Sequence, residues 1–220
     1  MKILLPLYVH PLANPAAWAA AAGSDRDVTV VIKVADGPGR QPPGADRDPV
    51  YAATTDRLFA ARVPMLGHVD LAYATRAVAD IVDDVARWAD YGVGGVFFDR
   101  APTSPFSSGP VALAIRVARR AGVGGRVIIN PGMPTDPVYR DLGAQIVVYE
   151  GSWDEYRRWA GDGSRPGDGH LVYGVPAGQL PVAEQMLDER GAGFGLATDL
   201  DAPSPYAGAP AWCSGMARVG

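Results

Sequence analysis

Short apolar segments recur along the chain at fairly even spacing, and most of them are continuous rather than alternating with polar residues. This pattern is typical of strands that are buried on both faces of a parallel sheet. It predicts eight strands, at residues 3–9, 28–34, 63–69, 95–99, 126–130, 146–150, 171–175 and 194–198.

Helical patterns lie between most of these segments. In residues 75–89 the apolar side chains of Ile81, Val85 and Trp88 recur at helical spacing, and Thr75 is a candidate N-cap. Strands and helices that alternate with short links indicate a parallel α/β sheet, and eight units favour a compact, single-domain (β/α)8 TIM-like barrel over residues 1–220. An open, doubly wound sheet is the alternative. The other predicted helices are 14–22, 50–61, 110–121, 152–159 and 180–190, with at most a short helix at 136–142.

Length and charge restrict the class of protein. A chain of 220 residues can form one barrel, because such barrels need about 200 residues or more. The net charge of −4 and the lack of a basic stripe argue against a nucleic-acid partner. No apolar run approaches the roughly 18 residues that span a membrane, and the apolar start is too short for a signal peptide. We therefore expect a cytoplasmic protein with no membrane partner, and the sequence leaves its oligomeric state open.

The sequence predicts neither a metal nor a cofactor. The stretch Gly37-Pro38-Gly39 lacks the spacing of a dinucleotide fingerprint, and no phosphate-binding loop is present. The single cysteine, Cys213, excludes an internal disulfide and a cysteine-based metal site. His10, His68 and His170 lie at different strands without the close spacing of metal ligands.

Two carboxylates at predicted strand ends are the candidate catalytic residues. In barrels of this class the working residues come from the C-terminal ends of the strands and the loops after them. Asp99 ends the fourth strand and Glu150 the sixth, and strands of the same parity contribute to the same layer of side chains. Two carboxylates in one site push their pKa values apart, which supplies one acid and one base. This is the minimum for hydrolysis of a glycosidic bond in a small-molecule or oligosaccharide substrate.

Further residues at the same strand ends are candidates for substrate binding. Tyr8, Tyr73, Tyr149 and Trp153 are aromatic side chains suited to stacking on sugars. Each polar candidate also has a structural interpretation: Asp70 as a helix cap, Asp199 as a turn former, His68 as a satisfied barrel histidine, Asn130 as the start of a turn. The polar candidates are His68, Asp70, Arg100, Asn130 and Asp199.

The same strand ends resemble the spherulation-specific family 4 (spherulin 4-like) proteins. The resemblance covers roughly residues 3–160 and is carried by Leu5-Pro6-Leu7-Tyr8, Gly37-Pro38-Gly39, Gly67-His68-Val69 with Tyr73 and Arg76, Gly94 to Asp99, Asn130-Pro131-Gly132 and Val147 to Ser152. It implies a TIM-like barrel related to fungal glycosidases that cleave α-1,4-linked galactosamine polymers. It also implies that Asp99 and Glu150 stand at two of the family's proposed catalytic positions.

The chain departs from the family pattern at Arg100. The family has an Asp-Glu pair where this sequence has Asp99-Arg100, so a fixed cation replaces one carboxylate. His68 replaces a tyrosine and Ala74 a glycine. Three functions therefore stay open: a glycoside hydrolase acting on an amino-sugar or related oligosaccharide, a barrel repurposed for acid–base chemistry on a small metabolite, and a non-catalytic carbohydrate-binding or interaction protein.

Overall fold

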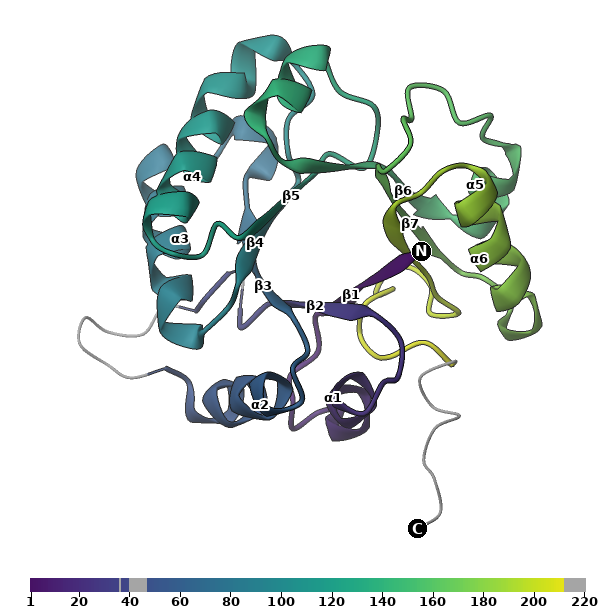
Figure 1. The fold of residues 1–220 in the computed structure, drawn as a ribbon, viewed down its shortest axis with the longest axis horizontal. Coiled ribbons are helices and arrows are strands. Elements are labelled where there is room, and N and C mark those ends of the chain that lie inside the picture. Colours follow the sequence, from purple (N-terminus) through teal and green to yellow (C-terminus); the bar gives the residue numbers. More distant parts are fainter. Residues whose placement is uncertain (36, 40–46, 212–220) are drawn as a thin grey trace.

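The computed structural model describes residues 1–35, 37–39 and 47–211, and these residues form a closed parallel barrel (Figure 1). Every strand pairs with the next one in sequence, and the last pairs with the first, which confirms the predicted TIM-like barrel. The strands are β1 (Lys2–Leu7), β2 (Val28–Ile32), β3 (Met65–Asp70), β4 (Gly95–Asp99), β5 (Arg126–Asn130), β6 (Gln145–Ser152), β7 (Gly169–Tyr173) and β8 (Phe194–Ala197).

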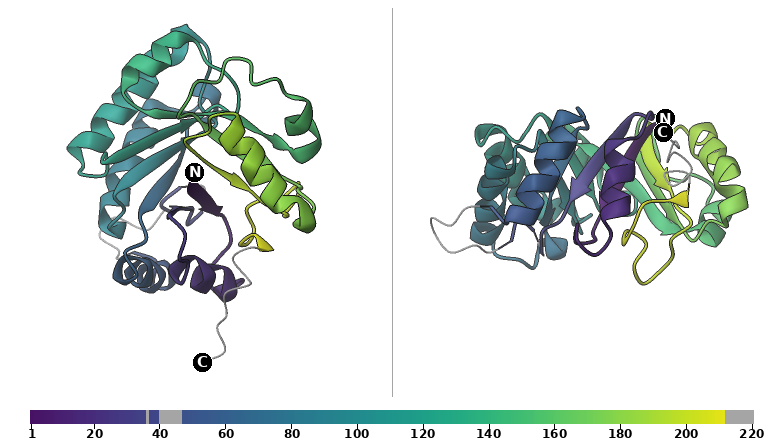
Figure 2. Two further views of the ribbon diagram at one scale, coloured as in Figure 1. Left: turned by 45° about the vertical axis from the view of Figure 1, so that its right-hand side comes forward. Right: turned by 90° about the horizontal axis from the view of Figure 1, so that it is seen from below.

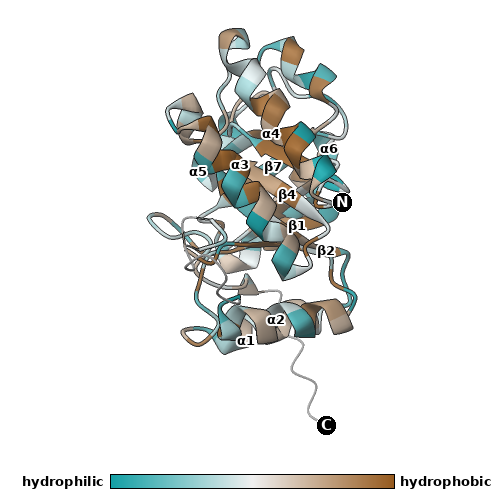
Figure 3. Cartoon of the chain, turned by 90° about the vertical axis from the view of Figure 1, so that its left-hand side faces the viewer, coloured by the Kyte–Doolittle hydropathy of each residue, from teal (hydrophilic) through white to brown (hydrophobic). Residues whose placement is uncertain are grey.

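Helices follow most strands and lie outside the barrel, running along the strands when the molecule is seen from the side (Figure 2). Figure 3 shows both polar and apolar segments along the helix after β3, whereas the strands behind it are mainly apolar. The helices are α1 (Pro15–Ala22), α2 (Pro49–Ala60), α3 (Val78–Arg87), α4 (Ser108–Arg120), α5 (Trp153–Arg158) and α6 (Leu180–Glu189), with short 3-10 helices η1 (Ala72–Ala74), η2 (Trp88–Tyr91), η3 (Pro105–Ser107), η4 (Pro137–Leu142) and η5 (Ala177–Gln179).

The strands form where the sequence is continuously apolar because both of their faces are covered. All five residues of β2 are buried, and so are the first four of β4. One face of each strand fills the barrel and the other packs against the helices. The sequence of these strands therefore lacks the alternation of polar and apolar residues that a half-exposed strand would show.

Side-chain caps fix the starts of several helices. Asp48 accepts hydrogen bonds from Val50 and Tyr51 at the start of α2, and Ser152 forms a capping box with Glu155 at the start of α5. The predicted cap of α3 is wrong. The Thr75 hydroxyl donates instead to the carbonyl of Ala72, so α3 starts without a side-chain cap.

The strand register brings polar residues together at one end of the barrel. Asp70 is aligned with Asp99 between β3 and β4, and Asp99 with Asn130 between β4 and β5. After β8 the chain returns across this end, where the carbonyl of Tyr206 accepts a hydrogen bond from the backbone N–H of Tyr8 at 2.9 Å. Cys213 lies outside the described residues. None of the helices in the described part of the chain is long and apolar enough to span a membrane.

Candidate active site

Asp99 and Glu150 are brought together by one asparagine. The side-chain nitrogen of Asn130, at the end of β5, donates to Asp99 Oδ1 at 2.8 Å and to Glu150 Oε2 at 2.6 Å. Asn130 is buried, whereas the two carboxylates are partly exposed. The prediction that strands of the same parity direct Asp99 and Glu150 to a shared site therefore agrees with this geometry. We call Asp99, Glu150, Asn130, His68 and Tyr206 the carboxylate cluster.

Asp99 is surrounded by hydrogen-bond donors that stabilise its ionised form. His68 Nε2 lies 3.1 Å from Asp99 Oδ2, and the backbone N–H of Arg100 donates to Oδ1 at 2.9 Å. Burial alone would raise the pKa of Asp99, but the hydrogen bond and charge of His68, with the bonds from Asn130 and Arg100, outweigh it. The pKa of this carboxyl consequently lies below its ordinary value.

Glu150 has the opposite tendency. Burial and the neighbouring charge of Asp99 raise the pKa of the Glu150 carboxyl above its ordinary value, and the hydrogen bonds from Tyr206 and Asn130 offset this only in part. The Tyr206 hydroxyl donates to Glu150 Oε1 at 2.6 Å. The pKa values of the two carboxyls are therefore shifted in opposite directions, downward for Asp99 and upward for Glu150.

Tyrosines close one side of the carboxylate cluster. The Tyr8 ring packs edge-on against His68, with ring centroids 5.2 Å apart, and against Tyr206 at 5.5 Å. Burial and the charges of Asp99 and Glu150 raise the pKa of Tyr8 well above its ordinary value, so its hydroxyl stays protonated near neutral pH. Sequence analysis missed Tyr206, because only the return of the chain after β8 places it beside β1.

Arg100 and Asp70 form an ion pair beside the cluster. The Arg100 guanidinium donates from Nε to Asp70 Oδ1 at 2.8 Å and also bonds Asp70 Oδ2 through Nη2. Arg100 therefore does not pair with Glu150. Its backbone adopts a φ of 49°, which is uncommon for a residue other than glycine and directs its N–H back onto Asp99.

The loop after β3 is bound to the same arginine. Ala72, Tyr73 and Ala74 all have positive φ, and the backbone N–H of Tyr73 donates to the carbonyl of Arg100 at 2.7 Å. The Tyr73 side chain is 59% exposed, so its ring is free to contact a ligand. Asp70 pairs with Arg100 and also accepts the N–H of Ala72, so it stabilises this loop rather than capping α3.

Three candidate residues lie apart from the cluster, and we remove them from the set proposed to bind a ligand. Tyr149 packs against Tyr156 and Trp159, since neighbouring residues of a strand face opposite sides and Glu150 occupies the inner one. Trp153 is buried at the start of α5, where its indole donates to Gln179 Oε1 at 2.9 Å. Asp199 accepts the backbone N–H of Ala211, which lies much further along the chain, so it holds together the segment that follows β8.

The three histidines do not form a metal site. His10 accepts the backbone N–H of Leu12, and His170 is buried between the Tyr156 and Ser164 hydroxyls. Within residues 1–35, 37–39 and 47–211, no three His, Cys, Asp or Glu side chains are grouped so as to hold a metal ion.

Comparisons with known proteins agree with this architecture. A sequence profile of spherulation-specific family 4 matches residues 2–219. Spherulin-4 of Physarum polycephalum is 30% identical over 152 residues, which cover 68% of this chain and 45% of the relative. The chain thus spans less than half the length of that relative. The crystal structure of Aspergillus clavatus Sph3 in complex with GalNAc superposes with a TM-score of 0.81 at 24% identity, covering 97% of this chain and 94% of Sph3. The chain belongs to spherulation-specific family 4.

Proposed function

We propose that the protein is a glycoside hydrolase that acts on an oligosaccharide containing N-acetylgalactosamine or galactosamine. The observation that carries this proposal is the shared hydrogen bonding of Asp99 and Glu150 to Asn130, together with the opposite directions of their pKa values. The likeness of the fold to Sph3, which was solved with GalNAc, supports the choice of sugar.

The electrostatics suggest a role for each carboxyl. Glu150, whose pKa is raised, is the carboxyl of the pair that holds a proton more readily, and we assign it the role of giving that proton to the leaving glycosidic oxygen. Asp99, whose pKa is lowered, stays ionised and can attack or stabilise the anomeric carbon. The His68 and Arg100 N–H groups hold Asp99 in place, and Tyr206 holds Glu150.

The spacing favours hydrolysis with retention. The facing oxygens of the two carboxylates are both bound to one nitrogen, at 2.8 Å and 2.6 Å, and this close approach is more typical of retaining enzymes than of inverting ones, which leave room for a water molecule between the carboxyl groups. Asp99 therefore acts as the nucleophile in this proposal, and Glu150 is the acid in the first step and the base in the second.

Turnover of α-1,4-linked galactosamine and N-acetylgalactosamine oligosaccharides tests the proposal, with released reducing ends as the readout. We expect Glu150→Gln to lower kcat/KM by about 10²–10⁴-fold, as loss of a general acid does, and Asp99→Asn by at least as much. Asp154→Asn is the matched control, because Asp154 is an exposed carboxylate on α5 paired with Arg157. Unchanged turnover by the Asp99→Asn protein would refute the catalytic assignment.

A non-catalytic, carbohydrate-binding function is the second candidate, and Arg100 favours it. Arg100 stands where the family pattern has a carboxylate, and its guanidinium is committed to Asp70. In that case the wild-type protein binds the same oligosaccharides in calorimetry and releases no product. Any turnover that depends on Asp99 would exclude this candidate.

A further inference from the structure

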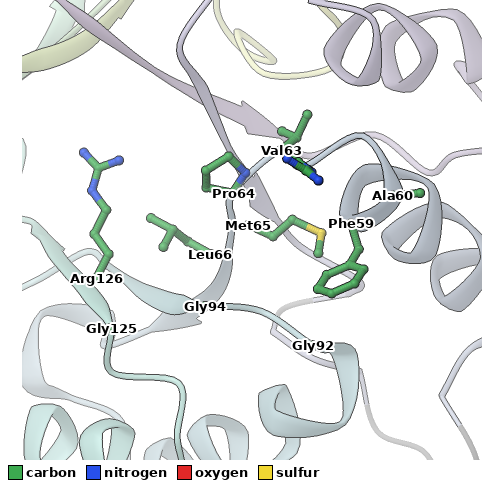
Figure 4. A pocket seen from close by; sticks show the side chains of 11 residues that line it. Phe59, Ala60, Val63, Pro64, Met65, Leu66, Gly92, Gly94, Gly125 and Arg126 are labelled. Atoms are coloured by element: carbon green, nitrogen blue, oxygen red, sulfur yellow. The ribbon is translucent and has the colours of Figure 1, made fainter.

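A concave site lies at the opposite end of the barrel from the carboxylate cluster. It is a pocket of about 630 Å³ between the end of α2, the start of β3 and the segments that precede β4 and β5 (Figure 4). Its lining includes Phe59, Met65, Leu66, Gly94 and Arg126. The N-terminal ends of the strands form this face, so the proposed hydrolase site makes no use of it.

The pocket has the size and lining of a small-molecule site. Ligand pockets usually measure about 300–1,000 Å³ and are lined mainly by apolar groups with a few polar ones. Phe59 is a large apolar side chain that is 72% exposed, and Met65 and Leu66 are buried. At Gly94 an added Cβ would meet no atom within 4 Å, so open space adjoins the backbone there.

One charged group gives the pocket a chemical preference. Arg126 donates from Nε to Gln145 Oε1 at 2.7 Å and from Nη1 to Thr29 Oγ1 at 2.9 Å, and its guanidinium lies 5.2 Å from the centroid of the Phe194 ring. These partners are all neutral. No carboxylate among the described residues lies within ion-pair distance of Arg126, and the nearby charge of Asp27 acts on it only at longer range.

A partly buried guanidinium without an anion is costly, since it loses hydration that no opposite charge replaces. Burial accordingly lowers the pKa of Arg126. A carboxylate from a ligand would offset this cost through charge-assisted hydrogen bonds. Arg62, which also lines the pocket and is exposed, adds a second positive charge.

We propose that this pocket binds an amphipathic carboxylate, whose anionic group pairs with Arg126 and whose hydrocarbon part lies against Leu66, Met65 and Phe59. Figure 4 shows Arg126 and Phe59 on opposite sides of the pocket, with Met65 and Leu66 between them. A ligand that is charged at one end and apolar at the other matches this order.

Calorimetry with decanoate and decanol tests the proposal, because these probes share a chain and differ in charge. We expect decanoate to bind the wild-type protein at least tenfold more tightly than decanol. Gly94→Leu fills the open space and should abolish binding of both probes, whereas Gly109→Leu, at an equally open and exposed position in α4, should leave both unchanged. Arg126→Gln should remove most of the preference for decanoate over decanol, with Arg62 left to supply the remainder.

Three results would overturn the site: no binding of decanoate, equal binding of decanol, or unchanged binding by the Gly94→Leu protein. Arg126 also contacts β2 through Thr29, so Arg126→Gln removes a structural hydrogen bond as well as a charge. The proposed site can therefore be tested without Arg126→Gln, by comparing the two probes on the wild-type protein and on the Gly94→Leu protein. Thermal unfolding shows whether each variant is folded. Neither measurement depends on hydrolysis, so the binding site and the proposed activity are tested independently of each other.

Discussion

At the scale of single residues, two carboxyls with the same chemistry differ because of their neighbours. Asp99 receives hydrogen bonds from His68, Asn130 and the backbone of Arg100. Glu150 receives fewer and lies beside the charge of Asp99. The sequence places both residues at strand ends, but it contains no local signal for these donors.

Tyr206→Phe tests the influence of one donor on Glu150. The hydrogen bond from Tyr206 lowers the pKa of Glu150, so its loss should raise that pKa further. If Glu150 is the general acid, it then stays protonated to higher pH, and the basic limb of the kcat/KM profile moves upward. Tyr149→Phe is the control, since the Tyr149 hydroxyl bonds the carbonyl of Ser152 and not Glu150 among the described residues. A basic limb that moves downward would contradict the assignment.

Arg100 allows a test of backbone strain that needs no substrate. A left-handed φ of 49° costs a residue with a side chain about 1 kcal/mol, whereas glycine adopts it freely. Arg100→Ala and Arg100→Gly both lose the half-exposed ion pair to Asp70, which we value at no more than about 1 kcal/mol. The Gly variant should therefore be more stable than the Ala variant by about 1 kcal/mol in urea unfolding. The reverse order would show that the conformation is not strained.

At the scale of elements, the continuous apolar runs explain why all eight strands could be predicted. β4 and β5 have the predicted bounds, and the other strands differ by a few residues at their ends. Among the 3-10 helices, η4 matches the short helix predicted at 136–142, whereas η1, η3 and η5 lie outside the predicted helices. Tyr149 shows a further limit of the prediction. It neighbours Glu150 on β6, and neighbouring residues of a strand face opposite sides, so the two side chains cannot enter the same site.

Gly67 in β3 illustrates how an element depends on one close contact. The indole of Trp88, in η2, lies against Gly67 and donates to the carbonyl of His68 at 2.8 Å. A Cβ at Gly67 would lie 2.3 Å from Trp88, so Gly67→Ala should destabilise the protein by about 1–3 kcal/mol. Gly94→Ala, which meets open space, should change the stability by less than about 0.5 kcal/mol. Equal stabilities in denaturant unfolding would contradict this packing.

At the scale of the whole molecule, the barrel separates two surfaces. The carboxylate cluster occupies the end where the strands finish, which is where enzymes of this architecture have their active sites. The pocket lined by Arg126 occupies the end where the strands begin. The long-range closure of the barrel also places Tyr206 beside Tyr8. Sequence patterns describe neighbours along the chain, so the contact between Tyr206 and Tyr8 could not be predicted from them, whereas the strand-end positions of Asp99 and Glu150 could.

The stability of the whole barrel should depend on pH through His170. Its ring is buried between the Tyr156 and Ser164 hydroxyls, and burial lowers its pKa to about 4, with Asp168 and Arg190 exerting smaller, opposite effects. Because the unfolded state binds the proton near pH 6.5, stability should be full above that pH and fall by about 3 kcal/mol as the pH drops to about 4. Denaturant unfolding of the wild-type and His170→Gln proteins across this range measures the effect. A difference between the two that does not change with pH would contradict it.

The central claim is that the site shifts the pKa of Asp99 downward and that of Glu150 upward, which fits one as the nucleophile and the other as the acid. Titration of their side-chain carboxyl carbons by ¹³C NMR, assigned with Asp99→Asn and Glu150→Gln proteins, tests it most directly. We predict that the pKa of Glu150 lies above its ordinary value and that of Asp99 below it. Ordinary values for both carboxyls, or the reverse order, would contradict the account.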